Sequence, residues 1–278
     1  MKPILYLCAG FGNPIGSPTL DQLEDELRWQ GIRQDVPTPS DAPILVSEFV
    51  GRTLHPIFLV GSFGPRDPIP SLEAVVATAQ EVDDRCYQLG ISCAVEVLNE
   101  TDITTMSPQQ FASYVTAVRS YLRPQTRVIS GGITSTSKNA LAYLRAAMPY
   151  LPETVTVGVH TYRSGPPTKP LPGFSSRQEE FDELHSIVGP RYIWNTEIGW
   201  STAPRKSGCF GLHKTQLTDA QVHDDLLAEY HLCAENEIEV MTVYQWADGP
   251  DPNNSYHRFG IIRTDGTLKP SAYLPQEV

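Results

Sequence analysis

The sequence lacks the cysteine spacings that mark disulfide frameworks and zinc sites. It holds an odd number of cysteines, none of them in a CxxC pair: Cys8, Cys86, Cys93, Cys209 and Cys233. Disulfide frameworks need paired cysteines, and zinc knuckles need closely spaced ligands. We therefore expect reduced thiols and a cytoplasmic protein, or a secreted one if a leader peptide has been removed.

Long hydrophobic runs are also missing. The apolar part of the amino-terminal segment covers residues 4–9, which is shorter than the roughly 7 to 15 residues of a signal-peptide core. No other run approaches the roughly 20 residues that cross a bilayer. We therefore expect no membrane partner and interpret the amino-terminal run as a strand.

Basic residues are too few and too scattered for a nucleic-acid-binding surface. Lysine and arginine number 21 against 32 aspartates and glutamates, a formal net charge of −11, so phosphates would not be neutralised. The nucleotide-binding patterns GxGxxG after the first strand and GxxxxGK are absent, and the histidines show no metal-ligand spacing. We expect no nucleic acid, cofactor or metal, and a monomer or weak oligomer.

What the sequence does contain is a regular alternation of strand-like and helix-like segments. Strands are predicted at residues 3–8, 32–36, 56–61, 91–99, 127–130, 154–162, 192–200 and 239–246. Helices are predicted between them at residues 20–30, 43–52, 72–89, 108–122, 137–147, 176–188 and 219–236. This alternation favours parallel strands with right-handed crossovers. The length suits one (β/α)8 TIM barrel of about 250 residues, so we predict a single catalytic domain over residues 1–278.

Local signals support two of the predicted helices. Gly31 follows the helix at 20–30 and is expected to end it, as a glycine after a helix commonly does. Ser71 can cap the amino terminus of the helix at 72–89, and Gly90 is expected to end it.

Polar and aromatic residues gather where the predicted strands end: Arg33, Asn99, Glu100, His160, Tyr162, Asn195, Glu197, Tyr244 and Trp246. In a (β/α)8 barrel the loops at this end form the active site. Glu100 lies at the exit of the fourth strand and Glu197 near the end of the seventh, which places them nearly opposite each other. Two facing carboxyl groups suit glycoside hydrolysis, and a separation of about 5 to 5.5 Å implies retention through a covalent intermediate.

Five motifs resemble those of a known enzyme group: EVLNE at 96–100, HTY at 160–162, TEIGW at 196–200, YQWADG at 244–249 and FGIIRTDGTLKPSAY at 259–273. Together they resemble the clan A retaining glycoside hydrolases, such as families 5 and 39. The resemblance covers the fourth to eighth strands and the carboxy-terminal tail well, and the first ninety residues weakly.

The resemblance implies roles for the two glutamates and their neighbours. Glu100 would be the acid/base and Glu197 the nucleophile. Tyr162 would hydrogen-bond the nucleophile, Arg33 would support it from the second strand, and His160 would contact the acid/base or the substrate. Donors beside Glu197 would lower its pKa and keep it ionised, whereas burial would keep Glu100 protonated.

The resemblance also implies substrate contacts. Asn99 would hold the 2-hydroxyl of the sugar, and Trp246 would form the floor beneath the sugar that is cleaved, the −1 subsite. Three loop aromatics, Trp200, Phe210 and Tyr256, are further candidate sugar platforms because a flat apolar ring can stack on sugar C–H groups.

The alternation of a strand gives predictions about individual side chains. Asn195 and Glu197 are expected to share the inward face of their strand, and Trp194 is expected in the outer packing layer. Asn99 and Glu100 are adjacent, so both reach the site only if the alternation breaks, as a β-bulge would allow.

Glu96 precedes this pair and lies nominally on the same inward face as Glu100, four residues further on. We interpret it as a buried, paired charge rather than a catalyst.

We predict a retaining hydrolase of β-glycosidic bonds in a glucan, xylan, mannan or derived oligosaccharide. One alternative is a metal-dependent sugar isomerase with Glu100, His160, Glu197 and Asp248 as ligands of Mg²⁺ or Mn²⁺, which prefer oxygen ligands. Another is a non-catalytic carbohydrate-binding barrel. Activity that resists chelators would count against the first alternative, and loss of function in Glu197→Gln would count against the second.

Overall fold

Eight parallel strands form a nearly closed barrel in this computed structural model, which describes residues 2–9, 20–203, 216–251 and 254–278. The strands are β1 (Ile4–Cys8), β2 (Gly31–Val36), β3 (His55–Val60), β4 (Ala94–Val97), β5 (Arg127–Ser130), β6 (Val157–His160), β7 (Ile193–Ile198) and β8 (Val240–Tyr244). Their order in the sheet is β5-β4-β3-β2-β1-β8-β7-β6. Backbone hydrogen bonds from Ser130 to Thr156 and from His160 to Ile133 join the two ends of that order. The predicted (β/α)8 fold is confirmed.

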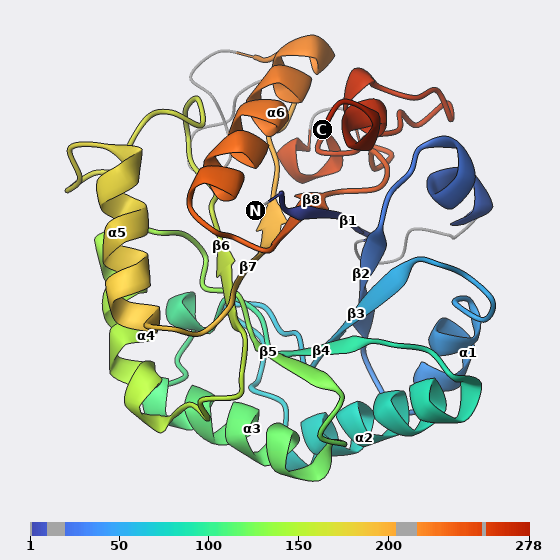
Figure 1. Ribbon diagram of the computed structural model, residues 1–278, viewed down its shortest axis with the longest axis vertical. Helices are drawn as coiled ribbons and strands as arrows, with labels where there is room; N and C mark the ends of the chain where they lie inside the picture. The colour runs from blue at the N-terminus through green and yellow to red at the C-terminus, as the bar shows by residue number, and fades with distance from the viewer. Residues whose placement is uncertain (1, 10–19, 204–215, 252–253) are drawn as a thin grey trace.

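Helices surround the barrel on its outside (Figure 1). They are α1 (Ala42–Ser47), α2 (Leu72–Leu89), α3 (Pro108–Tyr121), α4 (Lys138–Ala147), α5 (Arg177–Val188) and α6 (Asp219–Glu235). Short helical turns complete the outline at η1 (Gln22–Glu26), η2 (Thr101–Ile103), η3 (Met148–Tyr150), η4 (Ser255–His257) and η5 (Pro270–Gln276). The turn η5 packs on α6 and takes the place of an eighth helix.

The first predicted helix is wrong in type and length. Within residues 20–30 the chain is helical only over residues 20–26, mostly as the π-helical turn η1, at the end of which the Leu27 amide donates to the Gln22 carbonyl. The chain leaves this turn through Arg28, whose φ is 63°. Gly31 therefore ends no helix; it begins β2, where a Cβ atom would lie 2.1 Å from the Tyr6 ring and 2.3 Å from the His55 carbonyl oxygen.

The barrel interior is apolar at the amino-terminal ends of the strands. Side chains from six strands pack there as one cluster: Tyr6, Ile57, Ala94, Ile129, Trp194 and Val240. The prediction that Trp194 packs in the outer layer is wrong, because this residue plugs the barrel floor beside Tyr6, with ring centroids 6.3 Å apart. A second, larger cluster fills the space between the strands and the helices.

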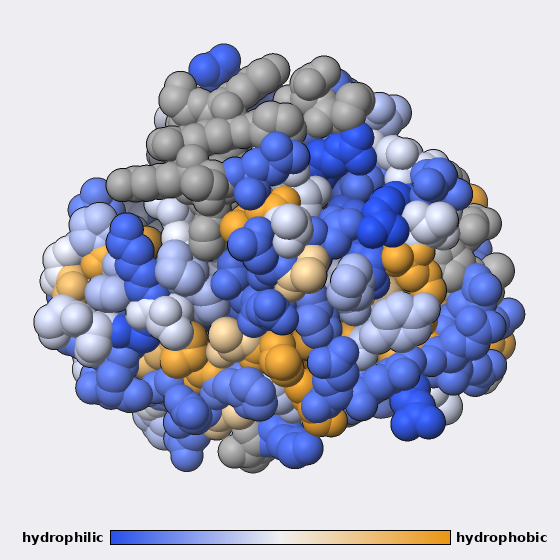
Figure 2. Space-filling view, turned by 90° about the horizontal axis from the view of Figure 1, so that it is seen from above, coloured by the Kyte–Doolittle hydropathy of each residue, from blue (hydrophilic) through white to orange (hydrophobic). Residues whose placement is uncertain are grey.

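The surface in Figure 2 is mostly hydrophilic, and hydrophobic residues occur there in small groups separated by polar ones. Within the described ranges, every helix is too short or too polar to span a bilayer.

Candidate active site

A pocket of about 190 Å³ opens at the carboxy-terminal ends of the strands. Both sequence-predicted catalytic residues line it, Glu100 beyond β4 and Glu197 on β7. Its remaining walls are Ile103, Thr134, Tyr162, Tyr244, Tyr256 and Phe259. Barrel closure therefore brings two carboxyl groups from distant parts of the sequence to one small cavity.

Arg33 of β2 connects the strands beneath this pocket. Its Nε donates to Glu96 at 2.6 Å, one terminal nitrogen donates to Glu197 Oε2 at 2.9 Å, and the other donates to Asn99 Oδ1 at 2.9 Å. Burial alone would lower the pKa of Arg33, but the charges of Glu96 and Glu197 hold it well above its ordinary value. The guanidinium is therefore a fixed positive charge that holds three side chains from two other strands.

Glu96 is fully buried and also accepts a hydrogen bond from the Gly132 amide at 3.2 Å. Its expected role as a buried, paired charge is confirmed. The bond from Arg33 fixes the amide of Asn99 as well, and directs its Nδ2 donor away from the guanidinium.

Glu197 receives hydrogen bonds on both carboxylate oxygens. Arg33 donates to Oε2, and the Tyr162 hydroxyl donates to Oε1 at 2.9 Å. Burial and the charge of Glu197 raise the pKa of Tyr162 well above its ordinary value, so this hydroxyl keeps its proton as a donor. These contacts hold the Glu197 carboxylate in one orientation.

Glu100 pairs with His160, whose Nδ1 lies 3.0 Å from Oε1 of Glu100. Burial raises the pKa of Glu100, but the hydrogen bond and charge of His160 outweigh burial and leave that pKa below its ordinary value. Burial lowers the pKa of His160, yet Glu197 and Glu100 together raise it. Both shifts favour the charged pair, with His160 protonated and Glu100 ionised. This corrects the expectation that burial keeps Glu100 protonated.

The exit of β4 explains how the adjacent Asn99 and Glu100 both reach the site. The strand ends at Val97, and both Leu98 (φ 68°) and Glu100 (φ 48°) adopt the left-handed conformation. Such values are uncommon for residues other than glycine and cost of order 1–3 kcal/mol each. Hydrogen bonds from the Leu98 amide to Val60 and from the Glu100 amide to Gly132 hold this path. The predicted break in alternation is present, as two left-handed residues rather than a bulge.

A register shift in β7 delivers Glu197. Asn195 pairs with Val159, but the next pair on β6 joins His160 to Glu197, so β7 contains one extra residue at Thr196. Asn195 lies in the outer layer, where its amide bonds the Thr161 hydroxyl at 2.8 Å. The prediction that Asn195 and Glu197 share the inward face is therefore wrong.

Of the predicted aromatic platforms, Tyr256 lines the pocket as expected, whereas Trp246 and Trp200 do not. Trp246 is 3% exposed and packs in the core, and Trp200 is fully buried, with its indole N–H donating to the Gly165 carbonyl at 3.1 Å. Neither ring lines the pocket; Tyr244 and Tyr256 do. Phe210 lies outside the described residues.

Sequence reasoning named Tyr244 without a role, and it missed Asp35. Both positions follow from strand alternation. Val240 is inward on β8, so Tyr244 is inward too; Arg33 is inward on β2, so Asp35 is inward as well.

The ligand set of the sugar-isomerase alternative is not brought together. Asp248 lies under the carboxy-terminal tail, where Lys269 Nζ contacts its Oδ2 at 2.8 Å and Arg258 donates to the same oxygen at 3.2 Å. Across the parts of the chain that the structure describes, no group of three or more His, Cys, Asp and Glu side chains is placed to hold a metal ion.

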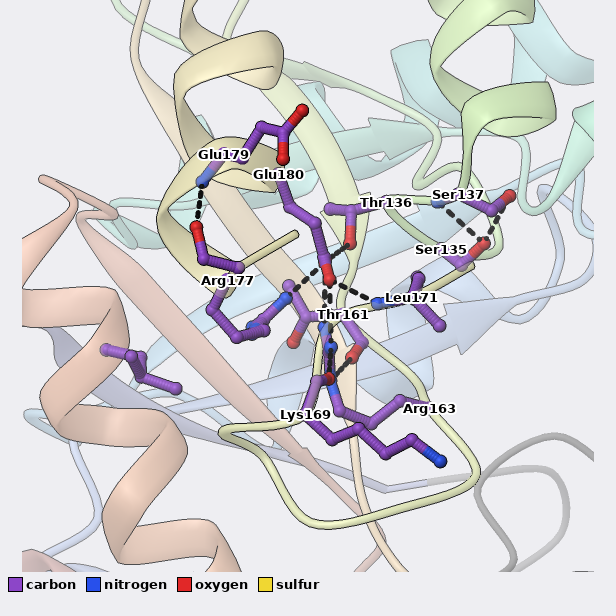
Figure 3. A network of polar contacts seen from close by, with 12 residues as sticks. Ser135, Thr136, Ser137, Thr161, Arg163, Lys169, Leu171, Arg177, Glu179 and Glu180 are labelled. Atoms are coloured by element: carbon purple, nitrogen blue, oxygen red, sulfur yellow. Dashed lines mark hydrogen bonds and ion pairs between the residues drawn. The ribbon is translucent and has the colours of Figure 1, made fainter. Parts of the chain in front are cut away.

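A buried polar network ties the loop after β6 to α5 (Figure 3). At its centre the buried carboxylate of Glu180 accepts hydrogen bonds from Thr136, at 2.7 Å, and Arg177, at 2.6 Å. It also accepts from the Leu171 amide at 2.5 Å and pairs with Arg163 at 3.3 Å. Arg163 directly follows Tyr162, so this network fixes the strand exit that supplies the donor to Glu197.

Two larger hollows, of about 590 and 460 Å³, lie at the opposite end of the barrel. Arg127 and Tyr192 line the first, and Glu153 is the only carboxylate residue among the described ones that lines either of them. This is the end of a (β/α)8 barrel that normally serves stability. The smaller pocket, with its two carboxylates, is therefore the candidate active site.

No protein-family model matches the chain, and no curated protein sequence does. A family 39 glycoside hydrolase from the gut symbiont Bacteroides cellulosilyticus WH2 is similar in structure, with a TM-score of 0.68 at 18% identity over 98% of this chain and 62% of that one. Cel5A of Thermotoga maritima, in complex with cellobiose, has a TM-score of 0.64 at 13% identity over 98% and 95%. A GH30 endoxylanase from Clostridium papyrosolvens C71 has a TM-score of 0.61 at 12% identity over 99% and 71%.

The chain thus spans less than two thirds of the family 39 protein's length. Identities this low show a shared fold. The resemblance to families 5 and 39 is confirmed at that level: this chain has the (β/α)8 architecture of glycoside hydrolases of families 39, 5 and 30.

Proposed function

We propose that this protein hydrolyses β-glycosidic bonds with retention of configuration, with Glu197 as nucleophile and Glu100 as acid/base. The observation that carries the proposal is the meeting of these two carboxyl groups on one pocket. Their environments differ, since Glu197 is held by two donors and Glu100 faces a histidine. Two carboxyl groups in contrasting environments are what glycosidase chemistry requires.

In the first step an oxygen of Glu197 forms a bond to the anomeric carbon while the bond to the leaving oxygen breaks. Glu100 gives a proton to that oxygen. Glu100 obtains this proton from His160, whose Nδ1 lies 3.0 Å from the Glu100 carboxylate. The proton passes from the ring to the carboxylate when the bound substrate excludes water from the pocket.

In the second step a water molecule attacks the same carbon from the side that the leaving group vacated. Glu100 accepts the proton of that water, the bond to Glu197 breaks, and the sugar leaves with its original configuration. Arg33 and Tyr162 receive the carboxylate of Glu197 again as it is released.

β-Glucans and xylans are the first candidate substrates, because the Cel5A neighbour binds cellobiose and the family 30 neighbour is an endoxylanase. Tyr244 takes over the stacking role that the sequence assigned to Trp246, since its ring lines the pocket. Asn99 donates to the 2-hydroxyl of the bound sugar.

The test is hydrolysis of aryl β-glycosides and common β-glucans, xylans and mannans by the wild type, Glu100→Ala and Glu197→Ala. We expect a loss of about 10²- to 10⁴-fold in kcat for Glu100→Ala on substrates with poor leaving groups. We expect about 10⁴-fold or more for Glu197→Ala. Glu239→Gln is the matched control, because this partly buried carboxylate lies at the opposite end of the barrel. A wild type that is inactive on every substrate, or variants that retain full activity, would contradict the proposal.

A further inference from the structure

Asp35 lies at the mouth of the barrel on the inward face of β2. The register between β2 and β3 is unbroken from the Gly31–His55 pair to the Val36–Val60 pair. Asp35 therefore keeps the inward orientation of Arg33, one step nearer the carboxy-terminal end. It is a further carboxyl group at this end of the barrel, and the catalytic scheme above does not use it.

One oxygen of this carboxyl group is buried without a partner. Asp35 Oδ1 has no hydrogen bond from any residue that the structure describes. Arg33, the nearest cation on the same strand, already donates to Glu96, Glu197 and Asn99. Buried carboxylate oxygens are normally hydrogen-bonded, and a lone orphan at a functional site points to a donor that arrives with a ligand.

The groups around Asp35 are those of the catalytic pocket. The charges of Arg33 on β2, Glu96 on β4 and Glu197 on β7 influence the pKa of Asp35. The charge of Asp35 in turn raises the pKa of the Tyr244 hydroxyl on β8, as does Cys8 of β1. Burial raises the pKa of Asp35 to about 7, with Arg33 opposing and the two glutamates reinforcing the rise. The register sets Arg33 of β2, Cys8 of β1 and Tyr244 of β8 at one level, so Asp35 lies two residues beyond the level of Tyr244, a residue that lines the pocket, toward the carboxy-terminal end.

We propose that Asp35 is a substrate-binding residue whose carboxylate accepts a hydrogen bond from one ring hydroxyl of the sugar beside Tyr244, and that it selects sugars that carry this hydroxyl. The inference rests on the proposed function. A hydroxyl fits better than a cationic group, because Arg33 already supplies positive charge beneath the site. The donor would satisfy Oδ1 and favour the ionised form of the carboxyl group.

The experiment compares the wild type with Asp35→Asn and Asp35→Ala on the best aryl β-glycoside and on analogues that each lack one ring hydroxyl. On the parent substrate we expect kcat/KM to fall about 10- to 100-fold in Asp35→Ala, the usual worth of a hydrogen bond to a charged group. On the one analogue that lacks the partner hydroxyl, the same substitution should change kcat/KM less than about two-fold. A purely structural role would lower the rate equally on every analogue.

Two further measurements keep the inference testable. In the wild type alone, the ratio of kcat/KM on the parent substrate to kcat/KM on the analogue without the partner hydroxyl should rise as pH increases through about 7. The reason is that the ionised carboxyl group of Asp35 is the better hydrogen-bond acceptor. Glu239→Gln should leave both the discrimination and its pH dependence unchanged. Equal losses on all analogues, or no loss, would overturn the role of Asp35. A wild type without glycosidase activity would instead overturn the proposed function.

Discussion

At the residue scale, the site depends on side chains that have no room to move. His160 is fully buried, and its Nε2 has no partner among the described residues, as is also true of the Thr196 hydroxyl beside it. Both atoms face Gly132: a Cβ atom there would lie 2.3 Å from His160 Nε2 and 2.8 Å from Thr196 Oγ1. The absence of one methyl group therefore permits the ring position that meets Glu100.

Gly132→Ala should impair catalysis by moving His160. Contacts of 2.3 Å are too short for a carbon and a ring nitrogen, and a ring in a packed core cannot shift without breaking its 3.0 Å contact with Glu100. We expect kcat to fall at least about 10²-fold, the usual contribution of a general acid. Gly165→Ala is the control, because its Cβ would meet only the flexible Lys169 side chain. Unchanged kinetics in Gly132→Ala would contradict this geometry.

The charges of Glu100 and His160 should make part of the stability depend on pH. The pKa of His160 is raised above 6.5, so its contribution is complete below that value and is lost as pH rises through the folded-state pKa. The pKa of Glu100 is lowered below 4.5, so its contribution is complete above that value and is lost as pH falls through the folded-state pKa. Both contributions are complete only between about pH 4.5 and pH 6.5.

The measurement is the free energy of unfolding in urea for the wild type and Glu100→Gln across the pH range. The difference should be largest between about pH 4.5 and pH 6.5 and should shrink on either side. Glu239 pairs with Arg127 rather than with a histidine. The difference in unfolding free energy between the wild type and Glu239→Gln should therefore not shrink as pH rises above about 6.5. A difference between wild type and Glu100→Gln that stays constant with pH would show that the pair is not charged in the native state.

Strand alternation predicted the site only where the strands are regular. Arg33 follows the period of β2, and it donates to Glu197, as the family resemblance implied. On β7 the extra residue at Thr196 reverses the faces, so Asn195 is outside and Glu197 is inside. No residue type in the segment signals that bulge. The bulge arises from the pairing of β7 with β6 and β8, and the sequence of β7 alone contains no information about that pairing.

At the element scale, buried charge fixes the loop between β6 and α5. Glu180 at the start of α5 holds Arg163, Thr136 and the Leu171 amide from three other segments (Figure 3). Burial raises the pKa of Glu180, but the charges of Arg163 and Arg177 outweigh burial and leave that pKa below its ordinary value, so the carboxylate is ionised. This network therefore fixes the exit of β6, which carries Tyr162.

Glu180→Gln should be strongly destabilising. The amide removes the negative charge that both buried arginines face, and breaking such a buried pair typically costs about 3–5 kcal/mol. Urea unfolding measures the change. Glu179→Gln is the matched control: its carboxylate bonds only the Ser175 amide and hydroxyl at the surface, so we expect a cost of no more than about 1 kcal/mol. Equal costs in the two variants would contradict the role assigned to the buried network.

Helix boundaries were predictable where both ends carry a local signal. The α2 helix runs from Leu72 to Leu89 as predicted, because the Ser71 hydroxyl accepts from the Ala74 amide and Gly90 takes a φ of 69°. The segment at 20–30 has an apolar face of three leucines, but the Asp21 side chain at the start of η1 makes no capping hydrogen bond, and the structure turns the segment into a short π-helical turn. Periodicity alone showed which side is buried and could not show that the helix would be cut short.

At the scale of the whole molecule, the two ends of the barrel have separate tasks. The amino-terminal end is closed by the apolar cluster around Trp194, and the carboxy-terminal end carries the charged groups around Arg33. Eight parallel strands bring residues 97 positions apart, Glu100 and Glu197, to one pocket. The number of βα units between these two residues indicated from the sequence that they would meet at one pocket. Which aromatic ring lines the pocket depends instead on where β8 ends, at Tyr244.

The central claim is that Glu197 attacks the anomeric carbon while Glu100 transfers the proton. The most direct measurement is the configuration of the glycosyl azide that each alanine variant forms from an activated aryl β-glycoside in the presence of azide. In Glu197→Ala the anion should occupy the space of the missing nucleophile, restore turnover and give the α-azide. In Glu100→Ala it should attack the covalent intermediate from the opposite side and give the β-azide. A β-azide from Glu197→Ala, or no rescue of either variant by azide, would contradict the account.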